Sequence, residues 1–452
     1  MQHNNALTTD LYQLTMAAAY FDNAMKDKIA TFELFVRELP KNRDYLITAG
    51  LEQAVEYLTN LQFTKEDINF LKEQPQFKHT SKEFWQYLTD FRFTGELRAV
   101  PEGTIIFAKE PILTITAPII EAQLVETYLL STINFQTMIA TKAAKIKEAV
   151  GKKQFFDFGM RRAHGTDAGI YAARASYIGG ADGTSCVIAG KEFGIPVKGT
   201  MAHSWVMANK TEEEACEKYA TVFPDSTVAL IDTYDSLKGT EKAIKTLGER
   251  LKGVRIDSGT LDEIIDTTQK IRKMLDNAGL KKTKIIASGD LNEDKIKYLE
   301  DKLAPIDMYG VGTELVTSKD APALGGVYKL VEIDGEPKMK KSSGKETLPG
   351  KKQIFRFVKA PRRDELYLEK DILGLENETF EAKQYGYVEK LLKPIITNGK
   401  LFNNAESFMG VKNAKINAAQ DLSEVYFSKL FDGVQISQRL QELTENALLR
   451  IA

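Results

Sequence analysis

The chain has 452 residues, 43% hydrophobic and 27% charged, which is typical of a globular protein with two or three domains. Its 61 basic and 63 acidic residues give a net charge of −2, which argues against a nucleic-acid or membrane partner. No stretch approaches the roughly 20 apolar residues that span a bilayer, and the amino terminus lacks a signal-peptide pattern, so we expect a cytoplasmic protein. The two cysteines, Cys186 and Cys216, fit buried thiols better than a disulfide or metal site.

Helical and strand patterns alternate through the first third of the chain. Residues 11–23 follow Thr9 and Asp10, a capping pair, and have the apolar spacing of a helix. Residues 31–39 alternate as a strand, and residues 93–118 read as short strands punctuated by glycine and proline, which predicts a mostly antiparallel sheet. A long helical pattern covers residues 121–150, and we expect a domain boundary within it.

From residue 154 onward, short apolar strands alternate with helices. The predicted strands are residues 154–158, 184–189, 195–199, 227–231, 253–256, 284–287, 308–311 and 326–330. This alternation predicts a parallel arrangement, which about seven or eight strands would form as an open sheet or as a barrel. The clearest helix is predicted over residues 260–278, with Asp257 or Ser258 as its cap. A lysine-rich loop or hairpin at 334–352 precedes mixed strands and a final helix over 422–450.

Three of the predicted strands end in small or hydroxyl-bearing residues. These ends are Arg-Ile-Asp-Ser-Gly at 255–259, Ser-Gly-Asp at 288–290 and Gly-Val-Gly-Thr at 310–313. Helix capping would explain any one of them equally well, but three successive ends favour a shared cradle for a phosphorylated sugar.

A pair of arginines follows the strand at 154–158. Arginine pairs are usually solvated surface features, but Arg161 and Arg162 stand at a strand end and directly precede the segment of His164. The planar guanidinium group suits phosphate and carboxylate, so one of the two is a candidate ligand for a diphosphate or an acidic substrate.

His203 stands near the end of another predicted strand. A lone histidine is more often structural than catalytic, yet Thr200, His203 and Ser204 fall at the same presumed edge as the other ends. No hydrolase triad or zinc pattern lies beside them. His203 is therefore a candidate general base, or a nucleophile that accepts a phosphoryl group.

Several ordered motifs resemble the nicotinate phosphoribosyltransferase family and together cover nearly the whole chain. They are TDLYQLTM at 9–16, FELFVRELPKNRDYLITAG at 32–50, FGMRRAHGTDAG at 158–169, GTMAHSW at 199–205, VRIDSG at 254–259, GVGTELVTS at 310–318, GGVYKLV at 325–331 and TLPGKKQIFR at 347–356. The resemblance implies an α/β fold, with an irregular TIM-like α/β barrel over residues 135–330. A smaller mixed α+β domain would combine residues 1–134 with residues 331–452.

The resemblance also implies a reaction. Nicotinate and 5-phosphoribosyl 1-diphosphate would give nicotinate mononucleotide and diphosphate in NAD salvage, with magnesium as cofactor and coupled hydrolysis of ATP. The pyridine nitrogen already carries a lone pair, so its attack on the ribose needs no strong base. Catalysis would depend on positioning the reactants and on stabilising the departing diphosphate.

Residue by residue, the resemblance makes His203 the histidine that ATP phosphorylates. Tyr12 and Phe158 would stack on the two faces of nicotinate, with Tyr12 supplied by a neighbouring subunit, so we expect a homodimer with shared active sites. Thr200 and Arg255 would contact the nicotinate carboxylate.

The remaining assignments concern the phosphoribosyl group. Arg161 would reach phosphoribosyl or diphosphate oxygens, and Asp257 would reach the ribose or its magnesium, directly or through water. Ser258 would bind substrate beside it. Gly289, Gly312 and Thr313 would hold the 5′-phosphate.

Two alternatives stay open. The related nicotinamide family places an aspartate near residues 183–185, where this chain has Ser185 and, slightly earlier, Asp182. A carboxylate facing nicotinate would repel the negative charge of this acid, so Ser185 favours nicotinate as the substrate. Asp182 leaves nicotinamide as an alternative substrate. The other alternative is a non-catalytic metabolite-binding paralogue, against which the complete set of candidate site residues argues.

Overall fold

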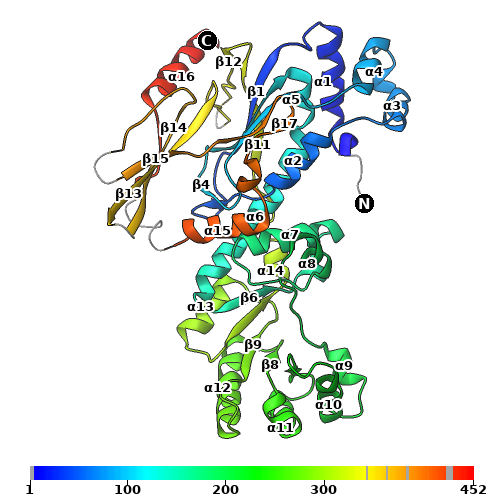
Figure 1. Ribbon diagram of the computed structural model, residues 1–452, viewed down its shortest axis with the longest axis vertical. Coiled ribbons are helices and arrows are strands. Elements are labelled where there is room, and N and C mark those ends of the chain that lie inside the picture. Colours follow the sequence, from blue (N-terminus) through cyan, green and yellow to red (C-terminus); the bar gives the residue numbers. More distant parts are fainter. Residues whose placement is uncertain (1–4, 343–344, 363–364, 383–385, 424–430, 452) are drawn as a thin grey trace. The chain divides into compact units, whose positions relative to one another are not determined.

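The computed structural model describes residues 5–342, 345–362, 365–382, 386–423 and 431–451 (Figure 1). The chain divides into two compact units, a terminal unit of Met1–Met138 with Ala323–Ala452 and a central unit of Ile139–Pro322. The sequence placed the corresponding borders at 134 and 330. In the part of the chain that the structure describes, none of the helices combines the length and apolar character needed to cross a membrane.

The terminal unit is built on a seven-stranded antiparallel sheet, as the sequence predicted for this region. Its order is β12-β11-β1-β5-β3-β16-β17, and every neighbouring pair is antiparallel. The strands are β1 (Ile29–Val36), β3 (Glu96–Ala99), β5 (Pro111–Pro118), β11 (Gly326–Ile333), β12 (Glu336–Pro337), β16 (Lys393–Thr397) and β17 (Lys400–Leu401), while β2 (Leu46–Ile47) and β4 (Ile105–Ile106) pair separately. The helices are α1 (Leu11–Asp22), α2 (Leu51–Asn60), α3 (Lys65–Lys72), α4 (Lys82–Thr89) and α5 (Ile119–Leu124).

The assignment of residues 326–330 to the parallel sheet was wrong. This segment belongs to β11, which pairs with β1 from Val36↔Gly326 to Ala30↔Ile333. A short apolar run shows that a segment is buried but does not specify its partner strand, and here the antiparallel ladder with β1 takes it.

A second, four-stranded sheet completes the terminal unit in the order β15-β13-β14-β18. Its strands are β13 (Lys352–Arg362), β14 (Glu365–Leu375), β15 (Gly386–Lys390) and β18 (Val434–Ile436). The predicted helix over 422–450 is much shorter: α15 (Val411–Asp421) precedes it, and α16 (Gln438–Ile451) begins only after β18 pairs with β14. Residues 424–430, within the predicted helix, lie outside the described residues. The Ser437 hydroxyl oxygen accepts the Leu440 amide and starts the helix there.

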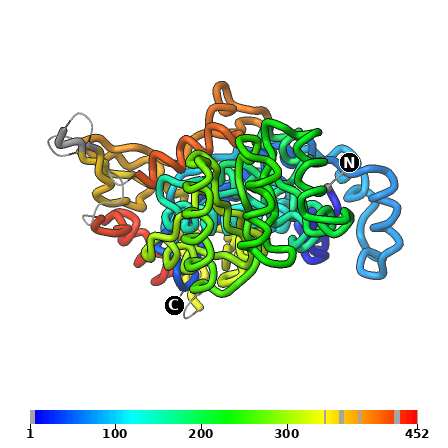
Figure 2. Tube along the Cα trace, turned by 90° about the horizontal axis from the view of Figure 1, so that it is seen from below, coloured from blue at the N-terminus to red at the C-terminus, as the bar shows by residue number. Residues whose placement is uncertain are grey.

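The central unit confirms the predicted parallel α/β architecture. Its sheet order is β6-β10-β9-β8-β7, and all neighbouring strands are parallel. These strands are β6 (Gln154–Asp157), β7 (Val228–Leu230), β8 (Gly253–Ile256), β9 (Lys284–Ala287) and β10 (Met308–Val311). The helices are α7 (Thr166–Ile178), α8 (Val187–Phe193), α9 (His203–Met207), α10 (Glu212–Val222), α11 (Ser236–Leu247), α12 (Leu261–Asn277), α13 (Glu293–Asp301) and α14 (Thr313–Val316), and α6 (Glu126–Val150) runs through both units. Figure 2 traces the same chain in a second direction, with the segments of this unit in green to yellow-green.

Two predicted strands of this unit are wrong. Residues 184–189 and 195–199 supply only single parallel bridges, Asp157↔Thr184 and Thr184↔Val197. The Thr184 hydroxyl accepts the Cys186 amide at 3.0 Å, which turns the chain into α8 before a strand can form. The barrel is therefore irregular and open, because no ladder among the described residues joins Val197 to β7.

The cap of α12 also differs from the prediction. Thr260, rather than Asp257 or Ser258, caps this helix and forms a capping box with Glu263. The Glu263 carboxylate accepts the Thr260 amide at 2.7 Å, and the Thr260 hydroxyl accepts the Glu263 amide at 3.3 Å. Asp257 and Ser258 therefore do not cap α12.

Candidate active site

The carboxyl-terminal ends of the parallel strands gather most of the predicted site residues. Phe158 follows β6, and its amide donates to the Val311 carbonyl at the end of β10. Asp257 follows β8, and Ser288 follows β9. Parallel strands end at the same edge of a sheet, so this edge is the natural place for chemistry in the unit.

Arg255, the third residue of β8, joins three elements through three different nitrogens. Its Nε donates to Ser288 Oγ at 2.8 Å and its Nη1 to Thr200 Oγ1 at 2.9 Å. Its Nη2 bonds Asp257 Oδ1 at 2.7 Å, and the Arg255 side chain is only 12% exposed. The guanidinium carbon also lies 5.7 Å from the centre of the Phe158 ring. The cation is therefore held in one place, next to an aromatic face.

Asp257 is an ionised carboxylate at this edge. Burial alone would raise its pKa, but hydrogen bonds from Ser288 and Arg255, together with the positive charge of Arg255, hold the pKa of Asp257 below its ordinary value. The Ser288 hydroxyl donates to Asp257 Oδ1 at 2.5 Å. The other oxygen, Oδ2, lies 4.0 Å from His203 Nε2.

His203 begins α9 and lies beside this group. Its Nδ1 is 3.1 Å from the Thr233 hydroxyl, and 41% of its side chain is exposed. The short helix α9 is attached to α10 by Trp205, whose Nε1 donates to the Ala215 carbonyl at 3.1 Å. The structure therefore brings His203, Thr200, Arg255 and Asp257 together, and the side chain of His203 is partly exposed.

Two glycines at the strand ends allow neighbouring parts of the chain to approach the backbone closely. Gly289 has φ +96°, and a Cβ atom there would lie 2.1 Å from the Asp257 carbonyl oxygen. A Cβ atom on Gly310 would lie 2.4 Å from the Phe158 ring. Gly312 precedes Thr313, the first residue of α14. These positions place bare backbone at the ends of β9 and β10, where a phosphate group can approach amides.

Of the other predicted residues, Ser258 lies beside Asp257, whereas Arg161 and Tyr12 are not brought into this cluster. Arg161 lies in a short 3-10 helix with an exposed side chain, and the described residues give it no hydrogen bond or ion pair. Tyr12 lies on α1 of the terminal unit with 47% of its surface exposed. The Ser258 hydroxyl donates to Asp232 at 2.7 Å.

The two residues that bear on the nicotinamide alternative have different surroundings. The Asp182 carboxylate accepts the Phe155 amide at 3.1 Å, within the strand rather than at its carboxyl end. Ser185 follows the bridge residue Thr184, and its amide donates to the Asp157 carbonyl at 2.8 Å. The carboxylate of Asp182 is thus engaged with the backbone of β6.

Asp232 is a site residue that the sequence interpretation missed. Its Oδ2 accepts the Asp257 amide at 2.8 Å as well as the Ser258 hydroxyl. Its Oδ1 is buried without a hydrogen-bond partner in the described structure. Asp232 comes directly after the predicted strand 227–231, so applying the strand-end argument to that strand would have found it.

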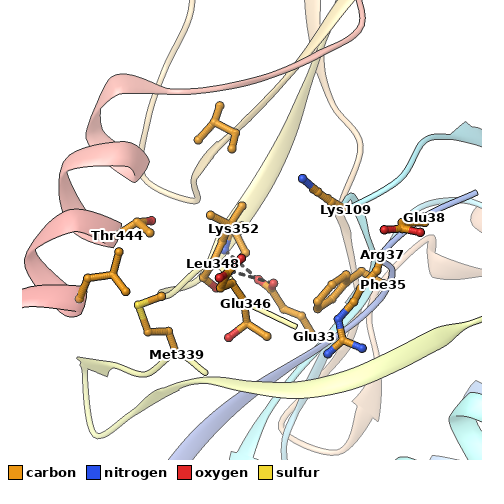
Figure 3. Close-up of a pocket in the computed structure, with 13 residues that line it drawn as sticks. Glu33, Phe35, Arg37, Glu38, Lys109, Met339, Glu346, Leu348, Lys352 and Thr444 are labelled. Atoms are coloured by element: carbon orange, nitrogen blue, oxygen red, sulfur yellow. Dashed lines mark hydrogen bonds and ion pairs between the residues drawn. The ribbon is translucent and has the colours of Figure 1, made fainter. Parts of the chain in front are cut away.

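A separate cavity of about 490 Å³ lies in the terminal unit (Figure 3). Glu33 and Lys352 point toward one another in its wall, with Lys352 Nζ 2.9 Å from Glu33 Oε2. Burial raises the pKa of Glu33 and lowers the pKa of Lys352, each opposed by its partner's charge. Arg37 also lines this cavity, whereas none of the predicted site residues does.

Comparisons with known proteins agree on one family. A sequence profile described as the nicotinate phosphoribosyltransferase (NAPRTase) N-terminal domain matches residues 7–134, and one for the nicotinate phosphoribosyltransferase (NAPRTase) family matches residues 153–364. The chain is 46% identical over 404 residues to nicotinate phosphoribosyltransferase pncB2 of Mycobacterium tuberculosis, covering 88% of this chain and 83% of the relative. It is 41% identical over 459 residues to nicotinate phosphoribosyltransferase of Bacillus subtilis, covering 98% and 89%.

Solved structures are similar over nearly the same length. Human nicotinic acid phosphoribosyltransferase matches with a TM-score of 0.82 at 28% identity, covering 98% of this chain and 100% of the human chain. Nicotinate-nucleotide pyrophosphorylase from Pyrococcus furiosus matches with a TM-score of 0.75 at 26% identity, covering 92% and 95%.

Proposed function

The chain belongs to the nicotinate phosphoribosyltransferase family, and from that premise we propose how its residues transfer a phosphoribosyl group to nicotinate and that ATP drives the transfer. The reactants are nicotinate and 5-phosphoribosyl 1-diphosphate, and the products are nicotinate mononucleotide and diphosphate. The observation that carries the proposal is the joined group of Arg255, Asp257, Thr200 and His203 at the strand ends.

Arg255 and Thr200 bind the carboxylate of nicotinate. The guanidinium group is fixed by its three hydrogen bonds, so little side-chain entropy remains to be lost when the acid binds. Phe158 supplies one face for the pyridine ring beside this cation. Ser185 introduces no negative charge, and Asp182 is bound to the β6 backbone, which supports the acid rather than the amide as substrate.

The ring nitrogen of nicotinate attacks the anomeric carbon of the ribose as the bond to the diphosphate oxygen breaks. No proton has to leave the nitrogen, so this step needs no general base. Gly289, Gly312 and Thr313 hold the 5′-phosphate on backbone amides, and Arg161, exposed at the end of β6, binds the departing diphosphate. Orientation and charge stabilisation supply the catalysis.

Magnesium fits the two aspartates of this edge. Asp257 is ionised, and among the described residues its Oδ2 has only the 4.0 Å approach of His203 Nε2. Asp232 contributes a buried Oδ1 without a partner in the described structure. Within the described residues no group of three or more His, Cys, Asp or Glu forms a metal site, but Mg²⁺ is usually held by one or two carboxylates plus water and substrate phosphate. When bound, the ion neutralises charge on the diphosphate.

His203 accepts the γ-phosphoryl group of ATP. A ring nitrogen forms a bond to the γ-phosphorus as the bond to the ADP oxygen breaks, and water later cleaves the phosphorus–nitrogen bond to restore the histidine. The partial exposure of His203 and its place beside Asp257 support this role. We also propose a homodimer, in which the exposed Tyr12 of one subunit covers nicotinate bound to the other.

The reaction is tested by incubating the purified protein with nicotinate and 5-phosphoribosyl 1-diphosphate, with and without ATP, and measuring the mononucleotide. Nicotinamide is run in parallel. Absence of product under all conditions would contradict the proposed reaction, and a preference for nicotinamide would reverse the substrate assignment.

The role of the histidine is tested by His203→Ala. We expect loss of ATP stimulation and of acid-labile protein phosphorylation, with an unchanged unfolding temperature. His79→Ala, at an exposed histidine of the terminal unit, is the matched control and should keep both properties. Phosphorylation that persists in His203→Ala would show that ATP acts elsewhere.

A further inference from the structure

Lys142 is a buried lysine of the central unit that the proposed reaction does not use. It lies on α6, and only 1% of its side chain is exposed. Its ammonium group donates to Glu293 Oε1 at 2.8 Å and to Asp320 Oδ1 at 2.8 Å. One buried cation therefore serves two carboxylates that come from different segments of the chain.

Those two carboxylates flank the backbone assigned to the 5′-phosphate. Glu293 is the first residue of α13, directly after the connection that carries Gly289. Asp320 follows α14, whose first residue is Thr313. Residues of α6, α13 and α14 also share one hydrophobic cluster, which includes Ala143, Ile296 and Leu315. Lys142 on α6 thus links the start of α13 to the segment that follows α14.

The two segments each contain a residue other than glycine in a left-handed backbone conformation, Asp290 before α13 and Ser318 after α14. Asp290 has φ +47° and Ser318 has φ +40°, left-handed conformations in which residues other than glycine cost about 1 kcal/mol each. Without the ammonium group, two partly buried carboxylates would be left without their shared cation. Repulsion between the two like charges would then favour a wider separation, and α13 and α14 would shift with them.

We propose that Lys142 is a positioning residue that holds α13 and α14, and with them the phosphate-binding backbone that precedes each helix, at the spacing a 5′-phosphate requires, an inference that rests on the proposed function. Lys142 touches no reacting atom. Its effect reaches the substrate through Glu293 and Asp320, so it acts mainly on the phosphoribosyl substrate, whereas the contact of Arg255 with Thr200 lies outside this link.

The test compares Lys142→Met, which keeps most of the unbranched apolar stem and removes the charge, with Lys142→Arg, which restores a cation able to bridge two carboxylates. For Lys142→Met we expect KM for 5-phosphoribosyl 1-diphosphate to rise about tenfold and KM for nicotinate to change less than about threefold. Lys142→Arg should recover most of the loss. Calorimetric titration with ribose 5-phosphate should show the same weakening without any turnover.

Lys153→Met is the matched control. Lys153 pairs with Glu300 at 2.7 Å within the same unit, just before the amino end of β6 and so at the opposite edge of the sheet. Lys153→Met should lower the free energy of unfolding without a selective rise in KM for 5-phosphoribosyl 1-diphosphate. If Lys142→Met fails to fold, Glu293→Gln and Asp320→Asn each remove one arm of the same link and should give the same selective rise in KM.

Equal changes in both KM values, or a selective effect in Lys153→Met as well, would overturn the proposal. An unchanged affinity of Lys142→Met for ribose 5-phosphate would overturn it too. A wild-type protein that binds ribose 5-phosphate but makes no mononucleotide would instead contradict the proposed function, and the titration would still decide the role of Lys142.

Discussion

Replacing Arg255 by lysine isolates the geometry of the guanidinium group from its charge. Arginine meets Ser288, Thr200 and Asp257 with three different nitrogens at 2.7 to 2.9 Å. An ammonium group at the end of a flexible stem keeps the charge but cannot reproduce three hydrogen bonds in a fixed plane. At least two of the three contacts should be lost.

The expected magnitude follows from those lost contacts. Hydrogen bonds to charged groups are worth about 1.5 kcal/mol or more each, so two of them amount to about 3 kcal/mol. If this misplaces the group that binds the nicotinate carboxylate, kcat/KM for nicotinate should fall about 100-fold. The assay measures mononucleotide formation at saturating 5-phosphoribosyl 1-diphosphate over a range of nicotinate concentrations.

Arg272→Lys provides a control of the same chemistry. Arg272 also uses three nitrogens, bonding Asp276 at 3.0 Å, the Thr283 carbonyl at 2.8 Å and the Leu280 carbonyl at 2.9 Å, but it lies on α12 away from the strand ends. It should lower the unfolding temperature and leave kcat/KM unchanged. A fall of less than about fivefold for Arg255→Lys, or an equal fall for both variants, would refute the reasoning.

Two further predictions concern the backbone of the site and the pH dependence of stability. Gly289→Ala would force a Cβ atom to within 2.1 Å of the Asp257 carbonyl oxygen, so steady-state assays should show kcat/KM for 5-phosphoribosyl 1-diphosphate reduced at least about tenfold. Burial raises the pKa of Asp421 to about 6, against the attraction of Arg356, while its unfolded value is about 3.9. The folded protein holds this proton more tightly than the unfolded chain, so the contribution of Asp421 to the free energy of unfolding is complete below about pH 4. About 3 kcal/mol of this contribution is lost as the pH rises through 6. Urea unfolding of wild type and Asp421→Asn across this pH range measures the loss.

Each of these predictions has a result that contradicts it. Gly279→Ala is the control for the first, because Gly279 has φ +79° and no described atom within 4 Å of a Cβ placed there. It should cost about 1 kcal/mol of stability and no activity, and an equal loss of activity in both glycine variants would contradict the close-approach argument. For Asp421, a stability difference between wild type and Asp421→Asn that stays constant from pH 4 to 7.5 would show that the group does not titrate in this range.

The sequence predicted the parts of the fold that depend on local pattern. The strands β8, β9 and β10 begin and end where their apolar runs do, and the spacing of Ile264, Ile271 and Leu275 predicted the buried face of α12. A local apolar pattern indicates that a segment is buried, but it does not indicate which strand the segment pairs with. The pairing of β11 with β1 and the single bridges at Thr184 and Val197 were therefore beyond it.

The local sequence pattern also predicted only part of the candidate active site. Arg255, Asp257, Thr200 and His203 could be placed at one edge because each follows or ends a short apolar run, and the structure brings them together. Lys142 could not be found this way. It looks like any lysine of a long helix, and its meaning depends on Glu293 and Asp320, which are distant in the chain.

The side of the parallel sheet beside β7 is closed by side chains rather than by a strand ladder in the described structure. Val197 and β7 are not joined by a ladder in the described structure, and the contacts that cross this seam are made by side chains. Thr200 bonds Arg255, and His203 meets Thr233. Met201 and Val206 also pack against Leu230 of β7 in one buried hydrophobic cluster across this seam. The residues proposed to bind nicotinate and ATP are thus held together across this seam by hydrogen bonds and apolar packing of side chains.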